Sequence, residues 1–241
     1  MAKPKQNAQK KQKSSLLGSS CLHLKEITPL TANQEIFFNN YDSGLSQILI
    51  GASGTGKTFL SMYKAFEEIN NLSNGFRKII VVRSAVPTRD MGFMPGTLGE
   101  KAEVYELPYR QICNELFGNG TAYEVLRKHR DIEFITTSFI RGITLNNAII
   151  LVDEFQSMNG HELESIVTRS GKNTKVLFSG DFVQSDLTKF TEKEGSKKFL
   201  EVLSELPDHF NVNSFTQEDI VRSPLVRDFI IKRDSKFPNG L

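Results

Sequence analysis

Short runs of branched apolar residues recur along the middle of the chain, separated by segments long enough to form helices. The runs cover residues 47–50, 78–82, 132–135, 148–152 and 175–178. They are nearly continuous rather than alternating, which is typical of strands that are buried on both faces. Such strands, alternating with helices, predict an α/β protein whose parallel sheet carries helices on both faces.

The first 20 residues follow a different pattern, because they are rich in Lys, Gln and Ser and have no apolar periodicity. Such a composition cannot offset the entropy of ordering by burying apolar surface. We therefore expect a disordered basic tail over residues 1–20 and a single domain over residues 21–241, with ordered structure beginning near Leu24. The lysines of the tail could bind phosphate groups without regard to sequence, or could only keep the chain soluble.

Composition narrows the class of protein further. The chain has 39% hydrophobic and 24% charged residues, an ordinary globular mixture. No apolar run approaches the roughly 18 residues of a membrane span, and the N-terminus lacks the apolar stretch of a signal peptide, so we expect a cytoplasmic protein without membrane association. A net charge of +2 does not by itself indicate a nucleic-acid binder, and Cys21 and Cys113 suggest neither a disulfide framework nor a zinc site.

A glycine-rich segment follows the first apolar run and matches the pattern GxxxxGK[ST] at every fixed position. Its residues are Gly51, Ala52, Ser53, Gly54, Thr55, Gly56, Lys57 and Thr58. The predicted strand before it and a helical stretch starting near Phe59 are the context in which this pattern binds phosphate. Glycines allow the loop to curl until its N–H groups face the phosphates. We expect the segment to bind ATP, with Lys57 reaching the β and γ phosphates and the Thr58 hydroxyl ligating Mg²⁺.

Two acidic residues, Asp153 and Glu154, end the apolar run of residues 148–152. A P-loop needs a carboxylate at the end of a neighbouring strand, and we assign Asp153 to the magnesium site beside Thr58. Glu154 would orient and deprotonate the attacking water, the role that separates a hydrolase from a nucleotide holder. An acidic pair after a strand is commonly only a helix cap, and the P-loop is what favours the catalytic interpretation.

A third candidate strand end carries Ser179, Gly180 and Asp181, with Gln184 shortly after. Polar groups at such a position meet ligands in α/β sheets, so Asp181 and Gln184 are candidate catalytic residues that would sense the γ-phosphate. A glycine turn capped by Asp181 is the competing interpretation.

Taken together, these segments resemble the PhoH-like phosphate-starvation-inducible ATPases over roughly residues 28–232. The resemblance rests on the P-loop and on residues 82–87, 91–101, 139–145, 152–156, 168–171 and 179–181. The family is related to superfamily 1 helicases, and the resemblance implies a three-layer αβα RecA-like P-loop NTPase with a mainly parallel sheet. It also implies ATP and Mg²⁺ as cofactors and ATP hydrolysis as the activity.

The resemblance implies two further nucleotide contacts. Residues 31–34 look like the glutamine-bearing segment that reads adenine in such helicases, which makes Gln34 the expected adenine contact, with a surface amide as the alternative. Residues 218–226 resemble the closing motif of the family, and Arg222 is the candidate arginine finger. Because the family is known for hexameric rings, Arg222 could act on a neighbouring subunit; an intrachain salt bridge is the alternative.

A ring of this kind implies RNA or single-stranded DNA as a partner. The candidate contacts are Arg83, Arg89, Arg141 and Arg169, together with Phe93 and Phe139 as platforms for stacked bases. Core packing is the more ordinary fate of a phenylalanine. The compact chain looks like the versions carried by bacteriophages and leaves no room for an appended nuclease or KH-like module, so we expect no nuclease activity.

Two other functions use the same P-loop. A phosphotransferase would pass the γ-phosphate to an acceptor hydroxyl, whereas Glu154 beside Asp153 favours water as the acceptor. A nucleotide-controlled assembly module would hydrolyse ATP only incidentally.

Overall fold

The computed structural model of the protein describes residues 21–71, 73–84, 98–181 and 190–237. These form one six-stranded sheet with the order β3-β2-β4-β5-β1-β6, in which each neighbouring pair of strands is parallel. The strands are β1 (Ser46–Gly51), β2 (Lys78–Arg83), β3 (Ile132–Thr136), β4 (Ala148–Asp153), β5 (Thr174–Gly180) and β6 (Phe210–Phe215). Each of the five apolar runs lies in one of the first five strands, so the predicted parallel sheet is confirmed.

The sequence does not predict the sixth strand, β6, because polar residues interrupt its apolar ones. Its asparagine amides are satisfied by residues far away along the chain. Asn40 donates to Asn213 Oδ1 at 2.8 Å, and Asn213 donates to Gln47 Oε1 at 3.0 Å. Partners that are distant in sequence therefore stabilise this edge strand, and a local pattern does not contain them.

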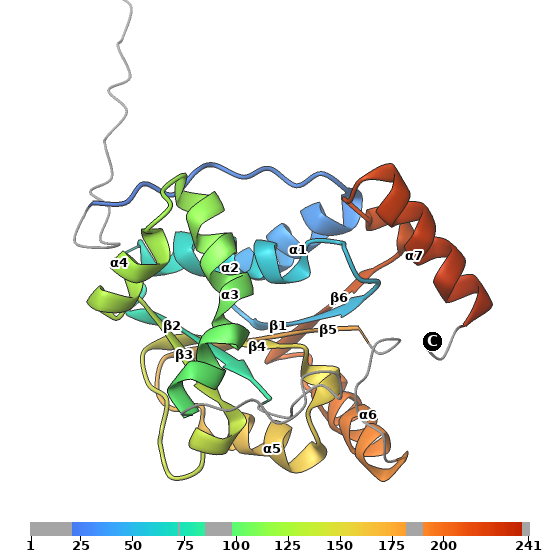
Figure 1. Cartoon of the computed structure of the whole chain (residues 1–241). Coiled ribbons are helices and arrows are strands. Elements are labelled where there is room, and N and C mark those ends of the chain that lie inside the picture. The colour runs from blue at the N-terminus through green and yellow to red at the C-terminus, as the bar shows by residue number, and fades with distance from the viewer. Residues whose placement is uncertain (1–20, 72, 85–97, 182–189, 238–241) are drawn as a thin grey trace, which may run out of the picture.

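Helices cover both faces of the sheet, which gives the predicted three layers (Figure 1). On one face lie α1 (Ala32–Asp42), α2 (Lys57–Ile69), α3 (Leu98–Phe117) and α4 (Ala122–His129). On the other face lie α5 (Gly160–Arg169) and α6 (Phe190–Ser204). The last helix, α7 (Pro224–Lys236), projects from the body of the molecule. Three short 3-10 helices complete the elements: η3 (Thr137–Phe139), η4 (Phe155–Ser157) and η6 (Gln217–Asp219).

The two faces of the sheet have separate hydrophobic cores, as the alternation of side chains along β4 shows. Ile149 and Leu151 belong to the core beneath α1 to α4. Ile150 and Val152 belong to the core shared with α5 and α6. All six residues of β4 are buried, which is expected of a central parallel strand.

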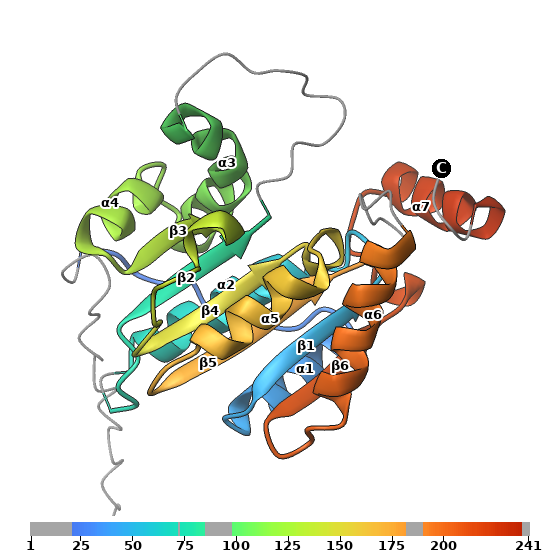
Figure 2. The ribbon, with the colours of Figure 1, turned by 90° about the horizontal axis from the view of Figure 1, so that it is seen from below.

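All six strands point the same way, so their carboxyl ends meet at one edge of the sheet (Figure 2). β5 lies between β1 and β4, so the P-loop and Asp153 come from strands that are separated by one strand. The expectation that the acidic pair ends a strand directly beside the P-loop strand is therefore wrong, and β5 is the direct neighbour. This order brings three polar strand ends together, because ligands in such sheets bind at the carboxyl ends of strands.

The packed part of the chain begins two residues earlier than expected. Leu22 is 2% exposed and packs into the core beneath α1 to α4, so packing begins before the expected Leu24. The expected tail, residues 1–20, lies outside the described residues. Within the described ranges, no helix is both long and apolar enough to cross a membrane.

Candidate functional site

The P-loop joins β1 to α2, and its glycines adopt angles or contacts that a side chain would prevent. Gly54 and Gly56 have φ angles of 79° and 84°, in the left-handed region that favours glycine. A Cβ on Gly51 would lie 1.8 Å from the carbonyl oxygen of Phe215 in β6. Gly51 is therefore required by the close approach of β6. This reason is separate from the expected curling of the loop around the phosphates.

Lys57, the first residue of α2, is only 8% exposed and folds back onto its own loop. Its Nζ donates hydrogen bonds to the carbonyl oxygens of Gly51 at 2.8 Å and Ala52 at 2.7 Å. Burial lowers the pKa of Lys57, while the negative charges of Asp181, Glu154 and Asp153 act in the opposite direction. The lysine thus lies beside a group of carboxylates, where a phosphate could replace the loop carbonyls as its partner.

Thr58 and Asp153 are brought together from residues far apart in the sequence. The Thr58 hydroxyl donates to Asp153 Oδ1 at 2.8 Å. A hydroxyl and a carboxylate oxygen at this separation are the hard oxygen ligands that Mg²⁺ prefers, so the pair fits the ion. The structure places the two expected magnesium ligands side by side.

The other oxygen of Asp153 has a partner that sequence reasoning missed. Tyr109, a fully buried residue of α3, donates its hydroxyl to Asp153 Oδ2 at 2.8 Å. Burial, and next the charge of Asp153, raise the pKa of Tyr109 well above its ordinary value, so the hydroxyl remains a donor at physiological pH. The positive charge of Arg83, at the end of β2, opposes this rise in the pKa of Tyr109. No local motif marks Tyr109, because its role depends on how α3 packs over the sheet.

Glu154 follows β4 with a backbone angle unusual for its residue type. Its φ is 53°, in the left-handed region, and strain of this kind is concentrated at functional sites. The side chain does not cap η4 but accepts a short hydrogen bond from Gln156 Nε2, so the helix-cap interpretation is not borne out. Burial, followed by the charge of Asp153, raises the pKa of Glu154, although the Gln156 hydrogen bond and two nearby cations oppose the shift.

Gln156 also connects Glu154 to the end of β5. Its Oε1 accepts a hydrogen bond from the backbone N–H of Asp181 at 3.0 Å. A Cβ on Gly180 would lie 2.4 Å from that same oxygen, so glycine is needed there for the connection. Asp181 itself is buried, and Gln184 lies outside the described residues. Gln156 is a second site residue that the sequence did not single out.

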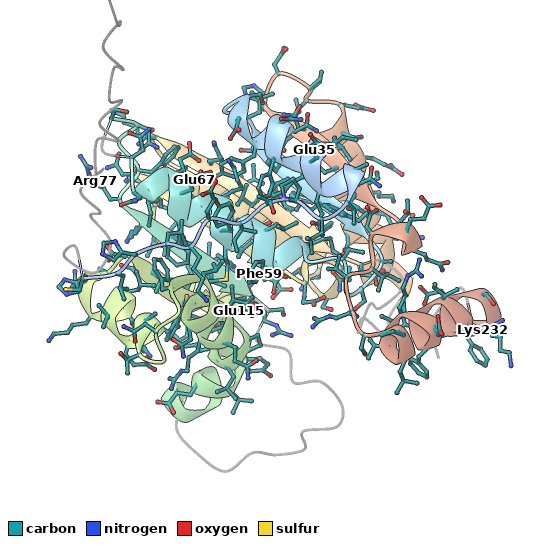
Figure 3. The ribbon with its side chains drawn as sticks, turned by 90° about the horizontal axis from the view of Figure 1, so that it is seen from above. Glu35, Phe59, Glu67, Arg77, Glu115 and Lys232 are labelled. Atoms are coloured by element: carbon teal, nitrogen blue, oxygen red, sulfur yellow. The ribbon has the colours of Figure 1, made fainter. Side chains whose placement is uncertain are left out.

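A cavity of about 610 Å³ opens over the P-loop and receives most of the expected site residues. The expected site residues that line it are Gln34, Ser53 to Thr58, Asp153, Glu154, Asp181 and Arg222. Additional walls come from the segment before α1, with Ile27, Thr28 and Leu30, and from α3, with Gln111, Ile112 and Glu115. Figure 3 shows Phe59 of α2 near Glu115 of α3, with the segment before α1 crossing above the helices.

Gln34 lies at the wall of this cavity and is not a surface amide, because only 2% of it is exposed. Its Oε1 accepts from Leu30 N–H at 2.8 Å, and its Nε2 donates to Thr55 O at 3.0 Å. A side-chain amide has two N–H donors and two acceptor lone pairs, so one of each remains after these bonds. The geometry leaves Gln34 able to bind a base edge while it braces the P-loop.

Arg222 lies at the cavity of its own chain. The N–H of Val221 donates to Gly54 O at 3.0 Å, and a Cβ on Gly54 would lie 2.9 Å from Arg222 Cγ. Among the described residues, no ion pair includes Arg222, so the salt-bridge alternative has no support. The side chain is exposed and borders the P-loop of its own chain.

The expected nucleic-acid contacts are not all at one edge of the sheet. Arg83 lines the cavity over the P-loop, whereas Arg169 ends α5, beside the amino ends of β4 and β5. Phe139 is 59% exposed, so the expectation that it packs in the core is wrong. Arg141 is exposed close to it in sequence, whereas Arg89 and Phe93 lie outside the described residues.

Comparison with solved structures finds a helicase domain and a large terminase, both of low sequence identity to this chain. The chain is similar to the Hef helicase domain of Pyrococcus furiosus, with a TM-score of 0.44 and 13% identity over 78% of this chain and 38% of that one. It is also similar to the large terminase of a thermophilic bacteriophage, with a TM-score of 0.48 and 14% identity over 84% of this chain and 50% of that one.

Comparison of sequences gives a family. Residues 26–232 match the model of the PhoH-like protein family. The chain is 34% identical to a PhoH-like protein of Bacillus subtilis over 78% of its length, and 31% identical to one of Mycobacterium bovis over 86%. It covers 57% of each of these two relatives, a little over half of their length. The chain belongs to the PhoH-like protein family.

Proposed function

We propose that the chain is a P-loop ATPase that hydrolyses ATP in the cavity over residues 51–58. The observation that carries this proposal is the joint position of Lys57, the Thr58–Asp153 pair and Glu154 at the wall of one cavity. Family membership supports nucleotide binding independently of the geometry. A phosphate-binding loop, a pair of oxygen ligands and a half-buried carboxylate base are parts that suit phosphoryl transfer to water.

Each residue has a role that follows from its position. Lys57 would exchange its bonds to loop carbonyls for bonds to the β and γ phosphates. Thr58 and Asp153 would hold Mg²⁺, which supplies charge neutralisation to the phosphates when it is bound. Glu154 would accept the proton of the attacking water, and its raised pKa brings its basicity closer to that needed near neutral pH. Asp181, held next to Gln156, would contact the γ-phosphate side of the site.

We further propose that Arg222 acts in cis, because it borders Gly54 of its own P-loop. An arginine at this place would neutralise charge as the γ-phosphoryl group leaves. Mixing Arg222→Ala subunits with Glu154→Gln subunits tests the assignment. A cis arginine predicts no recovery of turnover in proven mixed assemblies. Recovery would show that a neighbouring subunit completes the site.

RNA or single-stranded DNA is the proposed macromolecular partner, and ring assembly, as a hexamer, is the proposed quaternary state. Exposed Phe139 and the adjacent exposed Arg141 support a surface that stacks bases without reading sequence. Phe139→Ala should weaken binding of both a poly(U) and a poly(dT) oligomer about tenfold in fluorescence anisotropy. Unchanged affinity for both oligomers would remove Phe139 from this surface.

Steady-state phosphate release from ATP and Mg²⁺, with and without these homopolymers, tests the whole proposal, with Glu154→Gln as the blank. Stimulation by either polymer supports a nucleic-acid-dependent ATPase. Turnover that neither polymer changes would still support an ATPase and would favour the nucleotide-controlled assembly module. If phosphate is transferred only to an added acceptor hydroxyl, the protein is a phosphotransferase and not a hydrolase.

A further inference from the structure

A buried carboxylate joins two segments that flank the P-loop but lie near opposite ends of the chain. Asp219, in η6, is 2% exposed. Its Oδ1 accepts from the Thr31 hydroxyl at 2.6 Å, and its Oδ2 accepts from Asn33 Nδ2 at 2.7 Å. The backbone N–H of Thr216 also donates to Oδ2, at 2.8 Å. The Thr216 hydroxyl donates to Oδ2 as well, at 3.2 Å. Four donors therefore converge on one side chain, two from the start of α1 and two from Thr216 in its own turn.

The first segment carries the base side of the cavity. Thr31 caps the N-terminus of α1, and Asn33 lies in its first turn. Gln34 follows directly, and its amide holds Thr55 of the P-loop and the N–H of Leu30. Any shift of this turn relative to the P-loop would therefore move Gln34 and Leu30 together.

The second segment carries Arg222. Val221, two residues after Asp219, donates its N–H to Gly54 O at 3.0 Å. This bond fixes the backbone beside Arg222 against the top of the P-loop, where the absence of a Cβ on Gly54 makes room for the arginine stem. The position of Arg222 thus depends on how the loop after β6 is held.

The hydrogen bonds at Asp219 are charge-assisted on the acceptor side, which makes them stronger than bonds between neutral groups. Burial alone would raise the pKa of Asp219, but the bonds from Thr31, Asn33 and Thr216 together outweigh it and hold this pKa below its ordinary value. Among the described residues, no ion pair includes Asp219, so hydroxyl, amide and backbone donors are the groups that the structure shows satisfying the carboxylate.

We propose that Asp219 is a positioning residue whose carboxylate holds the Gln34 turn and the Arg222 loop against the P-loop as one unit. Base binding and phosphoryl transfer then depend on each other, because the residues for both steps share one anchor. This inference rests on the proposed ATPase function. It adds that catalysis requires the hydrogen bonds to Asp219, although Asp219 itself contacts neither the phosphates nor the base.

Asn33 provides the cleanest way to break this contact, because α1 offers a matched control. Both Asn33 and Asn40 lie in α1, are partly buried, and donate Nδ2 to a side-chain oxygen in the chain segment from β6 onward. The acceptor for Asn40 is Asn213, which does not line the cavity. Asn33→Ala and Asn40→Ala should therefore lower the thermal unfolding midpoint by similar amounts but differ in their effect on the site.

The first readout requires no nucleotide. Hydrogen exchange at the Val221 amide, followed in a peptide covering residues 217–222, should be at least tenfold faster in Asn33→Ala and unchanged in Asn40→Ala. Equal exchange in both variants would overturn the proposal whether or not the protein hydrolyses ATP. Failure of the wild type to release phosphate would instead count against the proposed function alone, which keeps the two failures distinct.

The second readout is turnover combined with nucleotide binding. Asn33→Ala should lower kcat about tenfold and weaken binding of a fluorescent ATP analogue several-fold, whereas Asn40→Ala should change kcat less than twofold. In a double-mutant cycle, Asn33→Ala with Arg222→Ala should cost much less in kcat than the product of the two single effects. Asn40→Ala with Arg222→Ala should be multiplicative. A multiplicative result for the Asn33 pair would show that Asn33 and Arg222 act independently and would overturn the shared anchor.

Discussion

The cavity over the P-loop, which we propose binds the nucleotide, has two ends that are built in different ways. The phosphate end is formed by the P-loop and by the ends of β4 and β5, which are central strands of the sheet with both faces packed. The base end is formed by the extended segment before α1, by the first turn of α1 and by α3. Strands fix the first end, whereas hydrogen bonds between distant segments, above all those to Asp219, fix the second.

This difference places the proposed residues for phosphoryl transfer and those for nucleotide binding on differently built parts of the fold. The groups that we propose act on the γ-phosphate are carried by central strands with both faces packed, where small displacements would be most costly. Groups that select and retain the nucleotide are carried by segments that a few hydrogen bonds hold in place. Changes at the phosphate end should therefore reduce kcat strongly. Changes at the base end should act mainly on affinity, except where they also displace Arg222, as we propose for Asn33→Ala.

The largest effect is expected at Glu154. Glu154→Gln keeps the size and the hydrogen-bonding reach of the side chain but removes the base, so kcat should fall by about 10²–10⁴ while ATP affinity remains within about threefold. Phosphate release and binding of a fluorescent ATP analogue measure the two quantities. Lys57→Ala serves as the contrast, because it should lose affinity. Retained turnover in Glu154→Gln would reject Glu154 as the base.

Tyr109 tests whether the phosphate end extends into α3. Tyr109→Phe removes the donor to Asp153 Oδ2 and should raise the Mg²⁺ concentration for half-maximal activity about tenfold, with little change in kcat at saturating Mg²⁺. Mg²⁺-dependent nucleotide binding gives a readout independent of turnover. Tyr123→Phe is the control, because Tyr123 is also buried and donates to a carboxylate, that of Glu106, away from the cavity. Equal Mg²⁺ dependence in the two variants would make the Tyr109 contact purely structural.

Gln34 tests the base end. Gln34→Ala should raise KM for ATP about fivefold to tenfold and reduce the preference for ATP over GTP. Guanine presents the opposite pattern of donors and acceptors to adenine, and without the Gln34 amide this mismatch no longer disfavours GTP. kcat should change less than KM. Gln47→Ala is the control, since Gln47 is another buried amide but lies on β1 away from the cavity. An unchanged ATP-to-GTP ratio would place the base elsewhere.

The smallest effect is one of stability. Because the folded-state pKa of Glu154 is raised, the folded protein binds this proton more tightly than the unfolded chain, and stability is lost as pH rises through that pKa. Glu154→Gln should therefore raise the unfolding midpoint of the nucleotide-free protein by a few degrees at neutral pH. The difference should vanish well below the ordinary glutamate pKa of about 4.3. A difference that is constant with pH would show that charge burial is not its cause.

Local sequence patterns predict the phosphate end well and the base end poorly, for the same physical reason. The P-loop, Asp153 and Glu154 are short motifs attached to apolar strands, so their relative positions follow once the parallel sheet is inferred. Tyr109, Gln156 and Asp219 each have a partner far away along the chain, and a local pattern does not contain that partner. Gln156 and Asp219 lie in segments that carry the family resemblance, but the sequence alone assigns neither of them a role. The same holds for β6 and its asparagines. The resemblance to a family supplied Gln34 and Arg222, which spacing alone would not have singled out.

A crystal structure with Mg²⁺ and a non-hydrolysable ATP analogue would show directly whether this cavity binds the nucleotide as proposed. We predict that Lys57 Nζ leaves the loop carbonyls for the β and γ phosphates and that Thr58 and Asp153 hold the metal. We also predict that the base lies against Gln34 with the contacts to Asp219 intact. A base bound away from Gln34, or a γ-phosphate remote from Glu154, would contradict it.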